Sequence, residues 1–365
     1  MKPRIVILGS SLTALAVARD AHAHGLQPVV IDTDPGIALA TRRARRVVVA
    51  DAEQALARVL DHAGAANALV ASGDDWLRFV VMHRTRLAAA FGTILHPSNP
   101  MLEVLLDKHA FAQWCAANAL PTPRTWVPDA EPRPAQLRFP LVVRPRATRH
   151  TRAVLPKAVE VHDESELRDW IHRYRARGVS PLVSESLLGR RLTQYSVPFA
   201  RNGDRMLSFV ARKLRPGPDR CSEGTLVEVT AHAEVEQLAR HAAVCAAYFG
   251  IGEAEILYAH DAGRAYLIEI NARPWLQYAL APATGHDFLG LLLGHEVAAT
   301  PRQARRTWIN LRGDRAVAFD RTTGLVRRGQ LGIGAYLRSL ARCNVFAVFD
   351  VRDPLPFARM VLRRR

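Results

Sequence analysis

Residues 252–275 read GEAEILYAHDAGRAYLIEINARPW, in which two short apolar runs flank the turn sequence HDAGR. This pattern predicts two antiparallel strands joined by a tight turn. Glu255 lies in the first strand, and Glu269 and Asn271 lie two residues apart in the second, so the latter two share a face. A carboxylate inside an apolar strand is costly without a compensating partner, and carboxylate and amide oxygens suit Mg²⁺. The hairpin therefore predicts a site for a metal ion and a nucleotide.

The segment EINAR, residues 269–273, together with Glu255, resembles the Mg²⁺-binding signature of the ATP-grasp superfamily. In that signature a Glu on one strand precedes E-x-N-x-R on the next. Arg273 falls on the same face as the carboxylates if the strand continues, where it would meet an anion. The resemblance implies an ATP-grasp fold that binds ATP and Mg²⁺. A solvent-exposed hairpin with ordinary surface acids is the alternative, and the apolar neighbours of the acids argue against it.

Length and composition fit a globular enzyme. The 365 residues suffice for two or three domains, and 49% hydrophobic against 23% charged residues is neither disordered nor membrane-spanning. No apolar run is long enough to cross a bilayer, and the opening MKPRIVILGSS predicts a strand rather than a signal peptide. Cys115, Cys221, Cys245 and Cys343 are scattered without a C-x-x-C pair, which predicts free thiols and no structural zinc. We expect a cytoplasmic protein.

The charge is strongly positive and is concentrated toward the C-terminus. The formal net charge is +16, and residues 301–365 hold fifteen Arg against four Asp. Such a segment suits an anionic substrate, a nucleic acid or an acidic membrane surface. A compositional preference for Arg accounts for more of the excess, since four of the fifty basic residues are Lys. With few interleaved aromatics and no recognisable motif, we expect no nucleic-acid partner. Residues 357–365 suit a basic amphipathic helix, for which packing on the core is favoured over peripheral membrane contact.

Residues 1–95 alternate strand and helix patterns, which predicts a parallel sheet with helices on both faces. The turn GSS at residues 9–11 would suit an anion, and Asp32 ends the second strand, where a dinucleotide-binding fold places its ribose-binding acid. The sequence G-x-G-x-x-G is absent, however. The region better resembles the small Rossmann-like domain of ATP-grasp ligases, in which this turn and Asp74 or Asp75 border the acceptor pocket. An ordinary loop cap is the alternative for these acids.

The expected fold class is α/β, with α+β character in the ATP-binding part. Residues 1–95 would form the Rossmann-like domain and residues 96–300 the ATP-grasp domain, with a lid subdomain at about 122–187. Residues 301–365 would form a basic C-terminal extension. The resemblance covers roughly residues 3–295. Its closest subgroup is the carboxylate–amine ligases, because no carboxylase-type partner domain is present, and homodimerisation is left open.

The scarce lysines fall where nucleotide chemistry needs them. Lys108 lies in DKHAF, which resembles the segment carrying the first ATP-contacting lysine, although an exposed helix lysine is the alternative. The run FPLVVRP at residues 139–145 resembles the buried family strand F-P-x-V-x-K-P, with Arg144 in place of the lysine. Lys157 matches the K-A pair before the next strand. Lys213, in an R-K pair, would lie near the γ-phosphate or an acyl phosphate.

Two segments would enclose the nucleotide. Residues 146–152 read RATRHTR, without the glycines of the usual phosphate lid, so side chains would cover the phosphates or bind an anionic substrate. Solvated loop residues are the alternative. The run PLVSESLLG, residues 181–189, resembles the hinge strand whose backbone meets adenine, and Glu185, Ser186 and Leu188 would line the base. No acid follows the hinge glycine to hold the ribose.

The resemblance implies an ATP-dependent carboxylate–amine ligase. A substrate carboxylate would attack the γ-phosphate to give an acyl phosphate and ADP, and an amine would then displace phosphate. Glu255, Glu269 and Asn271 would hold Mg²⁺, while Arg273 and Lys213 would be catalytic, Arg273 by stabilising the acyl phosphate or oxyanion. Two alternatives stay open: an NAD-linked oxidoreductase that uses the N-terminal sheet, and a nucleotide-binding protein without catalysis, which Arg144 and the glycine-free lid favour.

Overall fold

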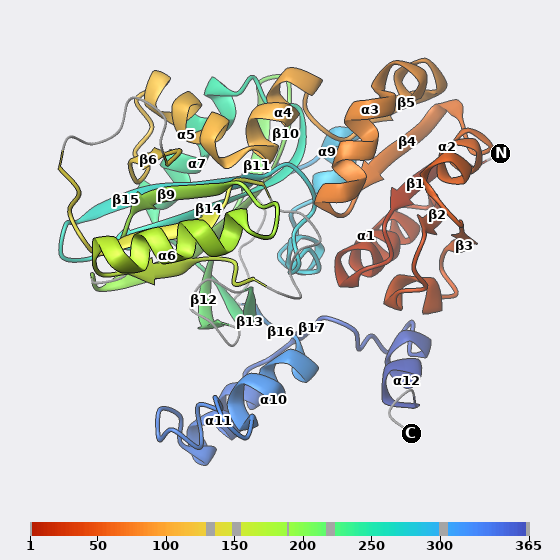
Figure 1. Cartoon of the computed structure of the whole chain (residues 1–365). Helices are drawn as coiled ribbons and strands as arrows, with labels where there is room; N and C mark the ends of the chain where they lie inside the picture. The colour runs from red at the N-terminus through yellow and green to blue at the C-terminus, as the bar shows by residue number, and fades with distance from the viewer. Residues whose placement is uncertain are drawn as a thin grey trace.

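The computed structural model describes residues 2–128, 136–147, 155–187, 190–216, 223–298 and 306–362. Three sheets organise these residues: a five-stranded parallel sheet, a four-stranded sheet and a central eight-stranded sheet. Figure 1 shows the parallel sheet and its helices at one end of the molecule, the four-stranded sheet toward the other end, and the C-terminal helices along a third side. This mixed architecture confirms the predicted α/β fold class.

The N-terminal region confirms the predicted parallel sheet. Its strands lie in the order β3-β2-β1-β4-β5, and neighbouring strands are parallel. Ser11 caps the first helix, its hydroxyl accepting from the amide of Ala14. The elements are β1 (Arg4–Leu8), α1 (Leu12–Ala23), β2 (Gln27–Asp32), η1 (Ile37–Ala40), β3 (Arg45–Val48), α2 (Ala52–Leu60), β4 (Gly64–Ala71), α3 (Asp74–Ala90) and β5 (Phe91–Ile94).

Two helices connect this region to the four-stranded sheet. Asp107 caps the second helix by accepting from the amides of His109 and Ala110, so a helix begins at Lys108. The sheet has the strand order β6-β9-β7-β8, and α6 packs on it over a small apolar core that includes Trp126 and Tyr174. The elements are α4 (Asn99–Leu106), α5 (Lys108–Ala117), β6 (Thr125–Trp126), β7 (Leu141–Pro145), β8 (Val159–Val161), α6 (Glu164–Arg175) and β9 (Pro181–Glu185).

The central sheet contains the predicted hairpin, with β14 antiparallel to β15. Its order is β15-β14-β10-β12-β13-β16-β17, with β11 paired to β10. Gly250 has a φ of +110°, and a Cβ there would lie 2.5 Å from the carbonyl oxygen of Leu95, so β14 begins directly against the N-terminal region. The elements are β10 (Leu192–Asn202), β11 (Arg205–Ser208), β12 (Val210–Pro216), β13 (Gly224–Thr230), α7 (Ala233–Cys245), β14 (Gly250–Ala259), β15 (Arg264–Asn271), α8 (Leu280–Ala283) and α9 (Phe288–Leu292).

The C-terminal segment joins the central sheet to the N-terminal region. Its strand β16 pairs with β13, and Asp314 forms a buried ion pair of 2.6 Å with Arg215 of β12. Farther along the chain, Asp353 accepts from Arg19 at 3.0 Å and from Thr41 at 2.7 Å. The segment is therefore packed on both regions, whereas the proposed domain limits stay a prediction. The elements are β16 (Thr307–Ile309), α10 (Leu311–Phe319), α11 (Ile333–Ala341), β17 (Val345–Phe346) and α12 (Leu355–Leu362).

Two further expectations concern cysteines and membrane spans. Cys115, Cys245 and Cys343 are free thiols, as predicted, and Cys221 lies outside the described residues. Among the helices of the described residues, none combines the length and the apolar character that crossing a membrane requires.

Candidate functional site

A cavity of about 280 Å³ lies between the four-stranded sheet and the central sheet, where charged side chains of both signs face one another. Nine of the eleven predicted site residues line it: Lys108, Arg144, Lys157, Glu185, Lys213, Glu255, Glu269, Asn271 and Arg273. Ser186 is not among the lining residues, and Leu188 lies outside the described part of the chain. Residues more than 150 positions apart in the sequence thus meet in one cavity.

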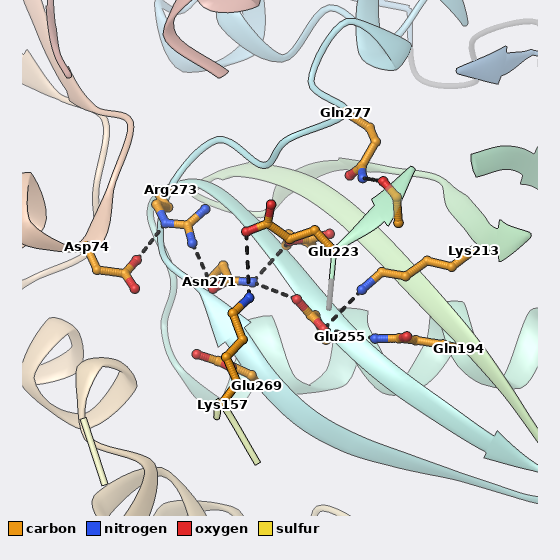
Figure 2. A network of polar contacts seen from close by, with 12 residues as sticks. Asp74, Lys157, Gln194, Lys213, Glu223, Glu255, Glu269, Asn271, Arg273 and Gln277 are labelled. Atoms are coloured by element: carbon orange, nitrogen blue, oxygen red, sulfur yellow. Dashed lines mark hydrogen bonds and ion pairs between the residues drawn. The ribbon is translucent and has the colours of Figure 1, made fainter. Parts of the chain in front are cut away.

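The hairpin brings its predicted residues together through strand register. Glu255 lies directly opposite Glu269, and Glu253 lies opposite Asn271. The side-chain amide of Asn271 donates to Glu253 at 3.0 Å and to Glu255 at 3.3 Å, while its oxygen accepts from Arg273 at 3.4 Å. Figure 2 shows Glu255, Glu269, Asn271 and Arg273 gathered beside the hairpin. The two-residue alternation of the strands is what places them there.

Two lysines compensate the hairpin carboxylates. Lys213 donates from Nζ to Glu255 at 3.3 Å, and Lys108 donates to Glu269 at 2.9 Å. Burial alone would raise the pKa of Glu255, but the Lys213 ammonium holds that pKa below its ordinary value. Burial would likewise lower the pKa of Lys213, and Glu255 raises it instead. Both groups are therefore charged at neutral pH.

Glu253 is a site residue that the sequence prediction missed. Its side chain is buried, and it accepts from the hydroxyl of Ser196 and from Asn271. Burial, followed by the negative charge of Glu255, raises the pKa of Glu253 to about 7. The signal was present in the sequence, since Glu253 and Glu255 stand two residues apart in one strand and so share its face.

Arg273 links the hairpin to the N-terminal region. Its Nε donates to Asp74 at 2.6 Å, across 199 residues of sequence. Burial alone would raise the pKa of Asp74, but the Arg273 guanidinium holds it below its usual range, and Asp74 in turn raises the pKa of Arg273. Asp74 lines the cavity, whereas Asp75 pairs with Arg78 at the surface, and the role of Asp74 beside an acceptor pocket stays a prediction.

On the side of the cavity formed by the four-stranded sheet, the charged side chains pair nearer the surface. Lys157 lies 3.9 Å from Glu223, and Glu185 accepts from Arg124 at 2.7 Å. The hydroxyl of Ser186 donates to Glu160 at 2.6 Å, and the neighbouring apolar residue Leu187 lines the cavity. Leu187, and not Ser186, is thus the neighbour of Glu185 that lines the cavity, whereas contact with adenine stays a prediction.

The remaining predicted residues of this side have separate partners. Arg146 donates to Asp107 at 2.7 Å, so this lid arginine holds the start of α5. Residues 148–152 of the arginine-rich stretch lie outside the described residues.

In the N-terminal turn, Ser10 donates to Asp32 at 2.6 Å and so caps that loop. Asp32 is not among the residues that line the cavity.

The donor set has the chemistry that a divalent cation needs. Glu255 and Glu269 face each other across the hairpin, and each already holds an ammonium group, so positive charge is stabilised at this point. Among the described residues, no three His, Cys, Asp or Glu side chains are grouped so as to hold a metal ion. A metal ion would therefore need two carboxylates together with the Asn271 amide oxygen or with oxygens of a bound phosphate.

No family model matches the sequence, and no curated protein matches it. Solved structures do match. The ADP complex of the N5-carboxyaminoimidazole ribonucleotide synthetase PurK has a TM-score of 0.70 and 14% identity, over 90% of this chain and 86% of that one. The Staphylococcus aureus N5-carboxyaminoimidazole synthetase with ADP has a TM-score of 0.71 and 14% identity, over 88% and 86%. At this identity the likeness concerns the fold.

Carboxylases share the same architecture. The biotin carboxylase domain of Hydrogenobacter thermophilus 2-oxoglutarate carboxylase, in complex with MgADP and bicarbonate, has a TM-score of 0.65 and 14% identity, over 84% of this chain and 74% of that one. Rhizobium etli pyruvate carboxylase has a TM-score of 0.63 and 16% identity, over 83% of this chain, which spans 29% of that longer protein. These proteins are ATP-grasp enzymes, and the chain has the ATP-grasp fold.

Proposed function

We propose that this protein is an ATP-dependent carboxylate–amine ligase that works through an acyl phosphate in the cytoplasm. One observation carries the proposal: Glu255 and Glu269 face each other in register inside a cavity, and each holds a lysine ammonium. Such an array of alternating charge suits a polyphosphate whose negative oxygens displace the carboxylates from the lysines. The fold shared with enzymes solved with ADP and MgADP supports the same conclusion.

The proposed reaction has two steps. A substrate carboxylate attacks the γ-phosphorus of ATP, and the bond from that phosphorus to ADP breaks. An amine then attacks the acyl carbon, phosphate leaves, and the amine loses its proton, so that an amide and phosphate form. Lys108, Arg144 and Lys213 would hold phosphate oxygens, and Lys157 would approach them from the lid. Arg273 would stabilise the charge that develops on the acyl oxygen.

Glu255, Glu269 and the amide oxygen of Asn271 would hold Mg²⁺. When bound, this ion would neutralise phosphate charge and so favour attack at phosphorus. The amide of Asn271 donates its hydrogens to Glu253 and Glu255, which fixes the side chain within reach of the carboxylates. Asp74 holds the guanidinium of Arg273 at the cavity wall and thereby keeps that cation next to the reacting groups.

A thermal-shift titration tests the nucleotide site. We expect Mg-ATP at a hundred times its dissociation constant to stabilise the protein by roughly 2.7 kcal/mol, and NADH and NADPH to leave it unchanged. Glu269→Gln should weaken the Mg²⁺-dependent part of the shift. Glu228→Gln is the matched control, because Glu228 pairs with Arg212 outside the cavity lining. A shift with NADH but none with ATP would refute the ligase and favour the oxidoreductase.

A second measurement separates catalysis from binding alone. Protein that binds Mg-ATP is supplied with panels of small carboxylates and amines, and ADP release is measured for each pair. We expect ADP and phosphate to appear with an anionic acid, since Arg144, Lys157 and Lys213 place three cations in the cavity lining. Lys213→Met should abolish release while ATP still binds. Binding without turnover for every pair would instead favour a nucleotide-binding protein without catalysis.

A further inference from the structure

The helix α11 has two contrasting faces. Its inner face carries Tyr336, which is buried against Phe319 and stacks below the guanidinium of Arg215, 5.2 Å from the ring centroid. Its outer face carries two large apolar side chains in water: Ile333 is 60% exposed and Leu337 is 58% exposed. One helical turn separates these two residues, so they form a continuous apolar stripe.

A line of arginines runs beside that stripe. Arg338 and Arg342 are exposed, and each follows an apolar position by one residue, about 100° around the helix. They therefore border the apolar stripe on the flank away from the buried Tyr336. We call Ile333, Leu337, Arg338, Ala341 and Arg342 the α11 face.

The sequence around the α11 face is strongly basic. Residues 320–342 contain five arginines and one acid, the exposed Asp320. Asp314, in the preceding helix, is fully buried and paired with Arg215, so it does not offset these charges at the surface. The partner that fits the α11 face therefore has to be anionic and has to accept apolar side chains.

The helix α12 also combines exposed apolar side chains with an exposed arginine. On α12, Val361 is 50% exposed and Leu362 is 70% exposed, and the exposed Arg359 lies on the same helix. Figure 1 shows α11 and α12 along the same side of the molecule, with the chain running from β17 to α12 beside the N-terminal region. Apolar and basic side chains are thus spread over two separate helices.

We propose that the α11 face, together with the exposed end of α12, docks on a lipid bilayer that carries anionic headgroups. The guanidinium groups would meet lipid phosphates, and Ile333 and Leu337 would enter the boundary between headgroups and acyl chains. A bilayer fits better than an acidic protein because the groups lie on two helices along one side of the molecule, as an extended surface requires. This contact is independent of the ligase reaction and needs no nucleotide.

Co-sedimentation with vesicles tests the proposal on the full chain. We expect sedimentation with phosphatidylcholine vesicles that contain about a third phosphatidylglycerol, loss of it in high salt, and none with phosphatidylcholine alone. Arg338→Glu/Arg342→Glu should weaken partitioning about thirtyfold or more, since each arginine near an anionic surface contributes a several-fold increase. Ile333→Ser/Leu337→Ser should weaken it several-fold without changing the salt dependence.

Matched controls carry the same changes on other surfaces. Arg58→Glu/Arg205→Glu removes two exposed arginines of α2 and β11, and Met82→Ser/Val244→Ser removes two exposed apolar side chains of α3 and α7. Both controls should sediment like wild type, and all variants should keep the wild-type circular dichroism spectrum. Equal loss in controls and α11 variants would overturn the α11 face as the docking site. Wild type that stays in the supernatant with anionic vesicles would overturn the bilayer as the partner.

Discussion

Glu253 and Glu255 stand two residues apart on β14, yet their surroundings separate their charge states. Lys213 lies on Glu255 and keeps it ionised, whereas Glu253 is buried behind it, with Ser196 and Asn271 as its hydrogen-bond partners. The ammonium of Lys213 compensates the carboxylate of Glu255, and the carboxylate of Glu253 carries the free-energy cost of burial. That difference is why burial raises the pKa of Glu253 to about 7 while the pKa of Glu255 is lowered.

Replacing Glu253 should therefore change the pH dependence of stability. Its folded pKa lies above the ordinary value of 4.5, so between about pH 4.5 and 7 the folded chain holds a proton that the unfolded chain has lost. The free energy of unfolding consequently falls as pH rises through this window, by up to roughly 3 kcal/mol. In EDTA, Glu253→Gln should gain stability relative to wild type as pH rises from 5 to 8, measured by urea unfolding at each pH.

The half-buried residue Glu228 provides the control for that series. Glu228→Gln also removes one carboxylate, but outside the cavity lining and away from the partners of Glu253, so it should not reproduce the gain in stability with rising pH that Glu253→Gln shows. A constant stability difference between Glu253→Gln and wild type would mean that Glu253 titrates normally in the folded protein, which would contradict the buried, uncompensated carboxylate.

Local sequence pattern predicted part of this site and could have predicted Glu253. The alternation of apolar and polar residues places Glu255, Glu269 and Asn271 on one face, and the same alternation includes Glu253. The ion pair of Arg273 with Asp74 is different. It joins residues 199 positions apart, and nothing in either local sequence specifies the partner. Such pairs depend on how the N-terminal region packs against β14.

At the scale of elements, His96 fixes the edge of the parallel sheet against the site. Its Nε2 accepts from the amide of Ala71 at the end of β4, and its Nδ1 donates to the carbonyl of Ala272 just after β15. Both ring nitrogens are used, one as acceptor and one as donor, so the imidazole has to be neutral. Burial accordingly lowers the pKa of His96 to about 3.

Acid should weaken the fold through this histidine. The unfolded chain binds a proton on the imidazole below about pH 6.5, but the folded chain does not until about pH 3, so the free energy of unfolding falls as pH falls over that range. The full effect on the free energy of unfolding is roughly 5 kcal/mol. His96→Phe loses two hydrogen bonds and should be less stable at pH 7. The gap from wild type should narrow as pH falls toward 4, in urea unfolding at each pH.

The exposed His22 separates this effect from general acid sensitivity. His22→Asn should follow the wild-type pH profile throughout. A gap between His96→Phe and wild type that stays the same from pH 7 to pH 4 would show that proton binding at His96 does not contribute.

The predicted elements were the ones with strong local periodicity. The β14–β15 hairpin and the first strands of the parallel sheet confirm their predictions, because each combines an apolar run with a clear turn or helix boundary. The short strands β5 and β16 did not stand out, since four and three residues carry too little pattern. The pairing of β16 with β13 across the central sheet depends on tertiary packing, which no local pattern encodes.

At the scale of the whole molecule, two ion pairs fasten the C-terminal segment to both regions. Arg215 and Asp314 are both buried, and the hydroxyl of Thr225 also donates to Asp314. At the other end, Asp353 is buried against Arg19. This arginine-rich segment thus contains two buried acids, Asp314 and Asp353, that pair with arginines of the other regions. Its composition alone did not predict that the segment adds strands to the central sheet.

Removing one partner of the Arg215–Asp314 pair should lower the free energy of unfolding far more than replacing both partners by apolar residues. Asp314→Ala leaves a buried guanidinium without its carboxylate and should lower the free energy of unfolding by roughly 3 to 5 kcal/mol. The double replacement Arg215→Met/Asp314→Leu removes both charges and should cost much less, because Thr225 keeps the carbonyl of residue 215 as a hydrogen-bond acceptor.

Urea unfolding of the two single variants and the double variant measures this difference, with Asp61→Ala as control. Asp61 pairs with Arg58 at the surface, so its loss should change stability by less than about 1 kcal/mol. If instead the effects of Asp314→Ala and Arg215→Met add up in the double variant, the two charges do not act as a pair. The C-terminal segment would then be held to the central sheet by its apolar contacts and strand pairing, and the buried charges would serve a purpose other than anchoring.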